Sequence, residues 1–266
     1  MASQTAIHKT FRLVTINVHS FNSAVGYNNN VNELVSILKP LNLDLLAVEE
    51  VENGDNWIKF CHDLSLKYFK FDATYGKYHG NGIASRYPII NASTRPIDFR
   101  CSGGKRSILQ FGLDGDHPFV INRLFAVTHL DHLDEDDRLK QIEYFKPHKQ
   151  NIDILIGDMN ALTRDDYSDD YYTNIVAGKR ETYGWEKPRF DLTHLITQEW
   201  HYQDALKLLH PTLKDEQLVT CAYGTRIDYI YLRPRRDDQW KLSKCSIINT
   251  QPATDHNAIF AEFENY

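Results

Sequence analysis

Polar side chains that could bind a cation or a phosphate group stand where apolar runs of the sequence end. They are Asn17 after FRLVTI, Glu50 after LDLLAVE, His129 after FAVT, Asp158 and Asn160 after DILIG, Asp228 within RIDYIYL, and Asp255 and His256 before NAIFAEF. A carboxylate at the end of a buried strand is costly unless it is paired or binds a cation. Each residue alone could equally belong to a turn, a helix cap or a structural histidine. Together they predict an active site at one rim of a sandwich fold.

The sequence patterns of the segments that must position these residues indicate many strands and few helices. Strands are expected at 11–17, 43–48, 82–85, 107–113, 119–128, 153–156, 226–232 and 258–263. Helices are expected at 32–41, 55–67, 135–145, 192–196 and 203–209. This order favours an α/β (α+β) four-layer sandwich, with two packed mixed β-sheets flanked by helices, over one doubly wound sheet.

Composition narrows the class of protein. The chain has 266 residues with 42% hydrophobic content and no internal repeat or long linker, so we expect a single domain over 1–266. Its formal net charge of −6 disfavours broad, non-specific nucleic-acid binding. The four cysteines are widely spaced, which argues against a disulfide scaffold and a thiolate zinc site. The N-terminus has no apolar leader and no stretch could span a membrane, so an intracellular protein, cytoplasmic or nuclear, is expected.

The tract 161–191 is expected to form a long loop beside the site, because it directly follows Asp158 and Asn160. It contains the acidic residues Asp165, Asp166, Asp169 and Asp170, the basic residues Lys179, Arg180, Lys187 and Arg189, and a group of aromatic residues that includes Trp185. These aromatics could stack on nucleobases or pack the loop onto the protein body, and the sequence leaves both readings open. The mixed charge favours a short, single-stranded or end-bound nucleic acid over a long duplex. Trp185 is therefore a candidate substrate-binding residue.

Seven short motifs occur in an order that resembles the endonuclease/exonuclease/phosphatase superfamily, which includes pancreatic-type deoxyribonuclease. They are TINVHS, LLAVEEV, GNGIASRYPI, THLDH, IGDMN, RIDYI and TDHNAI. The resemblance runs from Phe11 to Phe263, nearly the whole chain. It implies a metal-dependent hydrolase of phosphate esters.

The resemblance implies a role for each matching residue. Asn17, Glu50 and Asp255 resemble the metal-site residues of the superfamily, with Glu50 as the direct ligand. The other candidates contact water or phosphate: Asp158 as the group that aligns or deprotonates the attacking water, Asn160 as a donor to phosphoryl oxygens, His256 as the phosphate-facing histidine, Asp228 as its orienting carboxylate, His129 as a second histidine, and Arg106 as a substrate contact.

Elementary chemistry supports those roles. Phosphate-ester hydrolysis builds negative charge on oxygen atoms, so positioning and electrostatic stabilisation dominate catalysis. Hard carboxylate and amide oxygens favour Mg²⁺, or Mn²⁺, as the cofactor. No serine or cysteine nucleophile stands in a matching motif, so direct attack by water is favoured over a covalent intermediate.

The chain departs from the superfamily pattern at three positions. Glu49 replaces the usual glutamine before Glu50, which is expected to add a charge near the metal. The segment 75–80 lacks the acid that supports the first histidine in pancreatic-type deoxyribonuclease, so His129 has no evident orienting partner. Thr254 replaces the common serine before Asp255, a mild change.

Several alternatives stay open. The favoured activity is that of a nuclease-type phosphodiesterase, and the first alternative is a phosphatase or phospholipase-C-type enzyme acting on inositol phosphates or sphingomyelin. A catalytically inactive binding module on the same fold is a second, although no essential residue is missing. A zinc site built from His117, His129 and His132 is a third, weakened by the absence of an HExxH pattern.

Overall fold

Two six-stranded sheets form the centre of the computed structural model, which describes residues 10–26, 28–75, 79–235 and 238–265. In spatial order, the first sheet contains β11 (Trp240–Ile248), β12 (Ala258–Asn265), β1 (Thr10–Asn17), β2 (Leu45–Glu52), β4 (His79–Ser85) and β3 (Tyr68–Tyr75). The second contains β5 (Ile89–Pro96), β6 (Ser107–Leu113), β7 (Leu124–Thr128), β8 (Ile154–Asp158), β10 (Asp228–Leu232) and β9 (Gln203–Asp204). Both sheets combine parallel and antiparallel pairs.

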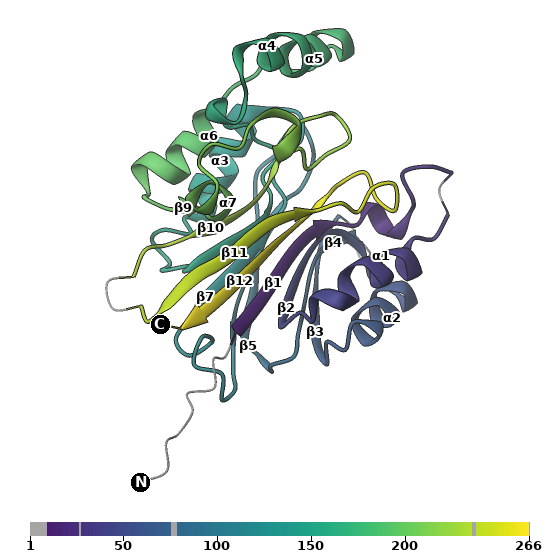
Figure 1. Ribbon diagram of the computed structural model, residues 1–266, viewed down its shortest axis with the longest axis vertical. Helices are drawn as coiled ribbons and strands as arrows, with labels where there is room; N and C mark the ends of the chain where they lie inside the picture. Colours follow the sequence, from purple (N-terminus) through teal and green to yellow (C-terminus); the bar gives the residue numbers. More distant parts are fainter. Residues whose placement is uncertain (1–9, 27, 76–78, 236–237, 266) are drawn as a thin grey trace.

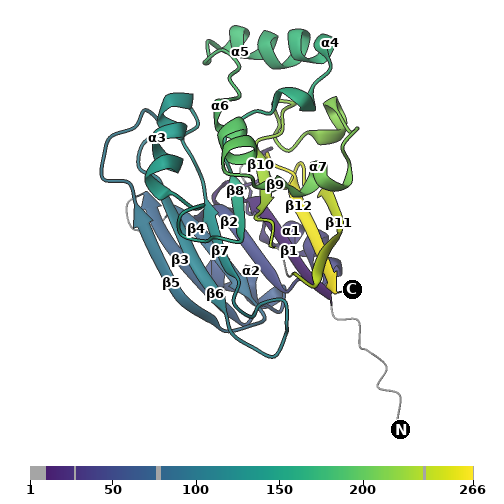
Figure 2. The same ribbon diagram turned by 90° about the vertical axis from the view of Figure 1, so that its left-hand side faces the viewer.

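Helices cover the outer face of each sheet (Figures 1 and 2). The longer ones are α1 (Val31–Leu38), α2 (Asp55–Asp63) and α3 (Glu135–Phe145). Of the shorter ones, α6 (Asp191–His194) also packs on an outer face, and α7 (Ala205–Leu209) contributes Ala205 and Leu206 to the core between the sheets. The other two, α4 (Asp169–Tyr171) and α5 (Gly178–Tyr183), lie beyond the end of the sheets. Short 3₁₀ and π-helical turns complete the set: η1 (His19–Phe21), η2 (Lys39–Leu41), η3 (Arg164–Asp166), η4 (Tyr172–Ala177), η5 (Leu195–Glu199) and η6 (Asp215–Leu218).

Three hydrophobic cores define four layers. The central core lies between the sheets and includes Leu13, Phe111 and Ile156. A second core packs α1 and α2 against the first sheet, and a third packs α3, α6 and η5 against the second. Burial of apolar side chains on both faces of each sheet is the main stabilising contribution. The predicted four-layer sandwich is confirmed.

The sheet topology brings the ends of distant strands to one edge. β1 and β2 are parallel and run side by side, with Asn17 opposite Glu49. β12 runs antiparallel to β1, so the segment that precedes it reaches the same edge. In the second sheet, β10 begins at Asp228 directly opposite Asp158, the last residue of β8. This arrangement explains why polar residues far apart in sequence meet in space.

Several predicted element boundaries are wrong. The strand expected at 119–128 begins only at Leu124, because Phe119 and Val120 bury their side chains from a turn in which Arg123 Nε–H donates to the Phe119 carbonyl at 2.7 Å. The helix expected at 55–67 ends at Asp63, and the segment 203–209 begins with the short strand β9 before α7. The sequence reading did not predict β3, β5 or β11.

The tract 161–191 is largely helical, which corrects its prediction as a loop. Residues 169–183 run through α4, η4 and α5 without interruption. Figures 1 and 2 show this helical arm projecting beyond the end of the sandwich where the strands converge. The arm is anchored by packing of Leu162, Tyr167 and Val176 against Cys221 and Ile227.

Candidate active site

A cavity of about 940 Å³ opens at the edge where the strands converge. Eight of the predicted site residues line it: Glu50, Arg106, His129, Asp158, Asn160, Trp185, Asp255 and His256. The other two, Asn17 and Asp228, lie directly behind it and contact lining residues. The structure therefore brings all the predicted residues together.

A buried Asp–His dyad forms the floor of the cavity. His256 Nδ1 lies 3.0 Å from Asp228 Oδ2, and both side chains are almost fully buried. Burial alone would lower the pKa of His256, but the charge and hydrogen bond of Asp228 outweigh it and raise that pKa well above its usual range. The imidazole is therefore cationic near neutral pH, with its Nε2 turned toward Asp158 Oδ2 at 3.9 Å.

Asp158 is the most confined carboxylate of the site. Its Oδ2 accepts a hydrogen bond from Asn17 Nδ2 at 3.2 Å, and its Oδ1 accepts one from the Asn160 backbone N–H at 2.9 Å. Burial and the neighbouring charge of Asp228 raise the pKa of Asp158 to about 7. The carboxylate is held at the end of β8, where Gly157 allows close approach to β7, because a Cβ there would lie 2.0 Å from the Thr128 carbonyl oxygen.

His129 faces the same carboxylate from the end of β7. Its Nε2 lies 3.5 Å from Asp158 Oδ2 and 4.0 Å from Glu50 Oε1. Burial, followed by the positive charges of Arg106 and His256, lowers the pKa of His129 well below its usual range. The two histidines of the site therefore differ in charge near neutral pH, with His256 cationic and His129 neutral.

The donor set fits a hard divalent cation. The carboxylates of Glu50 and Asp255 line the cavity and are partly exposed, at 39% and 32% of their side chains. Behind them, the carboxylates of Asp158 and Asp228 face one imidazolium, and Asp228 Oδ1 has no hydrogen-bond partner among the residues that the structure describes. Such an excess of buried negative charge favours a cation, and oxygen ligands suit Mg²⁺ or Mn²⁺.

Asn17, which the sequence predicts as a metal-site residue, contacts the carboxylate of Asp158 behind the cavity. Its Oδ1 accepts a hydrogen bond from the His19 backbone N–H at 3.0 Å while its Nδ2 binds Asp158. Both polar atoms of the amide are therefore engaged, and the side chain fixes the orientation of Asp158.

Glu49, which stands where the superfamily pattern has a glutamine, does not line the cavity. The side chain is fully buried, with Oε1 accepting a hydrogen bond from Thr15 Oγ1 at 2.9 Å. Burial and the charges of Asp228 and Asp158 raise the pKa of Glu49 well above its usual range. These surroundings favour the neutral form of the Glu49 carboxyl group, in which it would resemble the glutamine that it replaces.

Asn160 and Arg106 flank the dyad with donors. Asn160 adopts a positive φ of 50° and uses one N–H of its side chain to bind the Leu130 carbonyl at 3.1 Å, which leaves its second N–H for the cavity. Arg106 is 3% exposed and its Nη2 lies 3.1 Å from His132 Nδ1. A buried guanidinium beside a cavity is a suitable group for binding phosphate oxygens.

The zinc alternative is not supported. His117 packs against Phe11, Tyr87 and Trp240, and its Nε2 lies 3.1 Å from the Thr10 carbonyl oxygen. His117 does not line the cavity that contains His129 and His132. Among the residues that the structure describes, no cluster of possible metal ligands contains two histidines.

Sequence reasoning missed several residues of the cavity wall. They are Ser20 and Tyr223, together with the β3–β4 hairpin residues Thr74 and Asn81. Tyr223 lies between two predicted segments with no periodic pattern around it, so only the fold could bring it to the site. Lys179 and Arg180, which belong to the basic residues of the tract 161–191, also line the cavity, as does His132.

A buried ion pair connects the start of the arm to the segment before β10, the strand that begins with Asp228. Arg226 is fully buried two residues before Asp228, and it donates to Asp166 from Nε at 2.7 Å and from Nη2 at 3.1 Å. Its Nη2 also lies 2.6 Å from Asp204 Oδ2. The arm therefore begins from a fixed point beside the site.

Comparison with solved structures identifies the fold class. A protein described as endonuclease/exonuclease/phosphatase from Beutenbergia cavernae DSM 12333 aligns with a TM-score of 0.71 and 16% identity, over 97% of this chain and 72% of that one. D. rerio TDP2 complexed with single strand DNA product aligns with a TM-score of 0.62 and 16% identity, over 96% and 99% of the two chains. ANGEL2, a 2′,3′-cyclic phosphatase, aligns with a TM-score of 0.62 and 14% identity, over 97% and 95%.

Sequence comparison identifies the family. The sequence profile of the Endonuclease/Exonuclease/phosphatase family matches residues 14–256, so the chain belongs to this family of phosphoester hydrolases. No curated protein matches the sequence. In the described part of the chain, no helix has the length and apolar character needed to cross a membrane.

Proposed function

We propose that the chain is a Mg²⁺-dependent, nuclease-type phosphodiesterase that cleaves its substrate by direct attack of water. The observation that carries this proposal is the convergence of Asp158, the Asp228–His256 dyad and Glu50 on one cavity. A proton acceptor, a cationic donor and cation ligands each assist phosphate-ester hydrolysis, by activating water and by stabilising the negative charge that develops on oxygen.

Asp158 aligns and deprotonates the attacking water. With a pKa of about 7, its carboxyl group can accept a proton near neutral pH, and its hydrogen bonds to Asn17 and Asn160 fix the direction of its oxygens. The role of Asn17 is thus to position Asp158. A carboxylate held in this way gives a stronger rate enhancement than a mobile one.

His256 stabilises the phosphoryl oxygens. Its Nδ1–H donates to Asp228, which leaves Nε2–H for an oxygen of the substrate. The cation that Asp228 maintains on the ring is present before reaction and strengthens its interaction as negative charge develops. Asn160, Arg106 and neutral His129 donate further hydrogen bonds from the cavity wall.

Glu50 and Asp255 would hold the metal, with their exposed carboxylate oxygens as ligands. A divalent cation bound there would supply electrostatic stabilisation of the charge that develops on phosphate oxygens. The backbone and a neighbouring hydroxyl fix both carboxylates. Glu50 lies at an irregularity of β2, where the register with β4 shifts, and Asp255 Oδ1 accepts from the Thr254 hydroxyl at 3.3 Å.

The protonated thiol of Cys221 makes covalent catalysis by this residue unfavourable. Cys221 lines the cavity, but burial raises the pKa of its thiol, and its Sγ lies 3.2 Å from Thr225 Oγ1. A thiol is a poor nucleophile compared with its thiolate. Water is therefore the proposed nucleophile.

The nucleic-acid preference is supported by the likeness to TDP2 with its single strand DNA product and by the aromatic and basic residues of the cavity wall. The test is a panel of single- and double-stranded DNA, RNA, 5′-tyrosyl DNA, inositol phosphates and sphingomyelin, each with Mg²⁺. The highest kcat/KM is expected on a nucleic-acid phosphodiester, with Asp158→Asn as the inactive control. Activity restricted to monoesters or to sphingomyelin would replace the proposal with the phosphatase or phospholipase-C alternative, and no activity would favour a binding module.

A further inference from the structure

Three exposed aromatic side chains form one cluster at the mouth of the cavity. They are Tyr183 at 57% exposure, Trp185 at 39% and Tyr223 at 45%, and no other Phe, Tyr or Trp side chain whose burial the structure describes is as exposed. Tyr183 and Trp185 stack with ring centroids 4.9 Å apart, and Tyr223 meets Trp185 edge to face at 4.7 Å. We call these three residues the aromatic cluster.

The aromatic cluster belongs to the same cavity as the proposed catalytic groups. Trp185 and Tyr223 line the cavity whose floor is formed by Asp158 and His256. A single ligand can therefore place a phosphate on the dyad and a planar group on the cluster. Exposed apolar rings that face a polar site normally serve a ligand, because their exposure to water is otherwise unfavourable.

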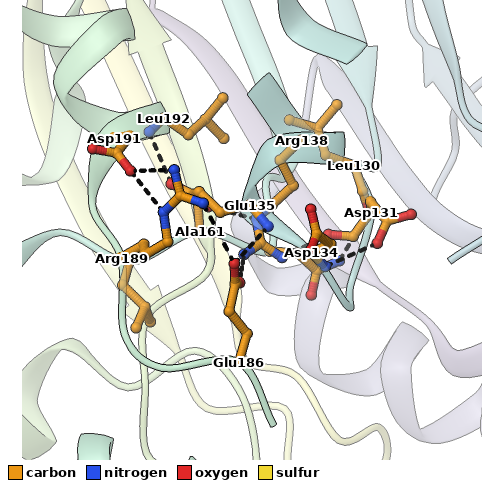
Figure 3. A network of polar contacts seen from close by, with 12 residues as sticks. Leu130, Asp131, Asp134, Glu135, Arg138, Ala161, Glu186, Arg189, Asp191 and Leu192 are labelled. Atoms are coloured by element: carbon orange, nitrogen blue, oxygen red, sulfur yellow. Dashed lines mark hydrogen bonds and ion pairs between the residues drawn. The ribbon is translucent and has the colours of Figure 1, made fainter. Parts of the chain in front are cut away.

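Other contacts already hold the arm, so the cluster is not needed as an anchor. Tyr171 Oη donates to the Gly224 carbonyl and Lys179 Nζ donates to the Tyr223 carbonyl, both at 3.0 Å. The far end of the arm is fixed to α3, where Arg138 Nη2 binds Glu186 Oε2 at 2.6 Å (Figure 3). Arg189 adds a bond to Asp136 at 2.7 Å.

The half-buried tyrosines of the arm have the packing role that the sequence left open. Tyr171 stacks on the buried Tyr167, and Tyr172 packs against Phe190 and the Arg164 guanidinium. The arm thus divides its aromatic residues between packing, near its start, and exposure toward the cavity, near its end.

We propose that the aromatic cluster is a base-binding subsite that stacks a nucleobase of a nucleotide adjoining the scissile phosphate. This inference rests on the proposed phosphodiesterase function and specifies its substrate as a single-stranded or terminal nucleotide. Stacking on aromatic rings is worth on the order of tenfold in affinity per base and tolerates any base, since every base has a π-face.

Charge near the cluster suits a short segment of nucleic acid. Lys179 and Arg180 line the cavity beside Trp185, where they can neutralise an adjacent phosphate. Glu186 lies on the same wall, and Asp169 and Asp170 are exposed further along the arm. These acids oppose an extended duplex, which requires a continuous basic surface.

The test uses a thymidine dinucleotide, which has one phosphodiester bond, and two analogues that each lack one of its bases. With Mg²⁺, the wild-type kcat/KM is expected to fall by on the order of tenfold when the stacked base is removed. Trp185→Ala and Tyr223→Ala should lower kcat/KM on the complete dinucleotide to the level of that analogue. Both variants should lose less activity on the analogue than on the complete dinucleotide. Trp185→Phe retains a ring and should retain most of the preference.

Ile121→Ala is the matched control, because Ile121 is exposed and does not line the cavity. This substitution should change hydrolysis of neither the dinucleotide nor the analogue. Thermal melting should show that all variants fold. If wild type cleaves the dinucleotide and both analogues equally, the subsite is refuted and the proposed function stands. Equal damage to all substrates with a lower Tm would assign the cluster to packing and also refute it. Cleavage of sphingomyelin in vesicles that depends on Trp185, without base preference, would assign the cluster to lipid. Absence of any phosphodiester hydrolysis would overturn the proposed function and this inference together.

Discussion

His256 Nδ1 lies 3.0 Å from Asp228 Oδ2, although Asp228 begins a strand of the second sheet and His256 precedes a strand of the first. The pairing is possible because the segment before β12 crosses beside the start of β10, with Asn257 N donating to the Thr220 carbonyl at 2.7 Å. Thr220 Oγ1 in turn accepts a hydrogen bond from the Asp228 N–H at 3.3 Å. The dyad is therefore fixed through its backbone as well as its side chains.

The first prediction concerns this dyad. His256→Ala and Asp228→Ala should each lower kcat by about a hundredfold or more, and the double variant should be little worse than either. Removing Asp228 deprives the ring of its charge, so the remaining histidine no longer stabilises the phosphate. Steady-state kinetics on a phosphodiester measure the three variants. Losses that multiply would show that the two residues act independently.

Asp158→Asn should lower turnover by about a hundredfold or more, because the amide cannot accept the water's proton. The Tm of this variant, measured in chelator, gives a second readout. The pKa of Asp158 is raised from 3.8 to about 7 in the folded protein, so its favourable contribution is complete below pH 4 and is lost as the pH rises through 7.

The stability comparison between the wild type and Asp158→Asn follows from that shift. At pH 8 the wild type carries a buried charge that the variant lacks, so it should be the less stable of the two by up to a few kcal/mol. The difference should vanish near pH 4, where the carboxyl group is protonated in the folded state. A pH-independent difference would contradict the burial of this charge.

Metal dependence is the third prediction. Activity should be lost in chelator and restored by Mg²⁺ or Mn²⁺, with little restoration by Ca²⁺, whose larger and looser shell positions phosphate less strictly. Glu50→Gln should raise the Mg²⁺ concentration needed for half-maximal activity by about tenfold or more, because a ligand charge is lost. Glu52→Gln, a nearby exposed acid outside the cavity, is the control. Full activity in chelator would refute the metal dependence of the reaction.

Much of the site could be predicted from the sequence because strands that end at one edge carry their polar residues there. Asp158, Asp228 and His256 each adjoin an apolar run, and those runs are the central strands β8, β10 and β12. The charge states could not be predicted in the same way. Glu49 and Glu50 are neighbours in sequence, yet one is fully buried and the other faces the cavity.

The arm shows where local patterns fail. Residues 169–183 have no regular apolar spacing, since the arm buries little beyond Val176, and its helices depend on anchoring at both ends. The sequence does not predict strand β5 either. Most of its residues are exposed, so buried and exposed positions do not alternate along it. Tertiary contacts determine such segments more than propensity does.

The anchor of the arm supports the last prediction, which concerns Arg226. Both it and Asp166 are fully buried, so removing the guanidinium leaves uncompensated carboxylates at Asp166 and Asp204. Lys207 Nζ, 3.8 Å from Asp166 Oδ1, compensates the charge of Asp166 only in part. Arg226→Met should therefore lower the free energy of unfolding by about 3 kcal/mol, measured by urea denaturation. Arg164→Met is the matched control. Arg164 also pairs with an aspartate of the arm, Asp169, but that aspartate side chain is 94% exposed, and an exposed pair contributes less than about 1 kcal/mol. If the two substitutions lower the free energy of unfolding equally, the buried Arg226 ion pairs contribute no more to stability than an exposed ion pair does.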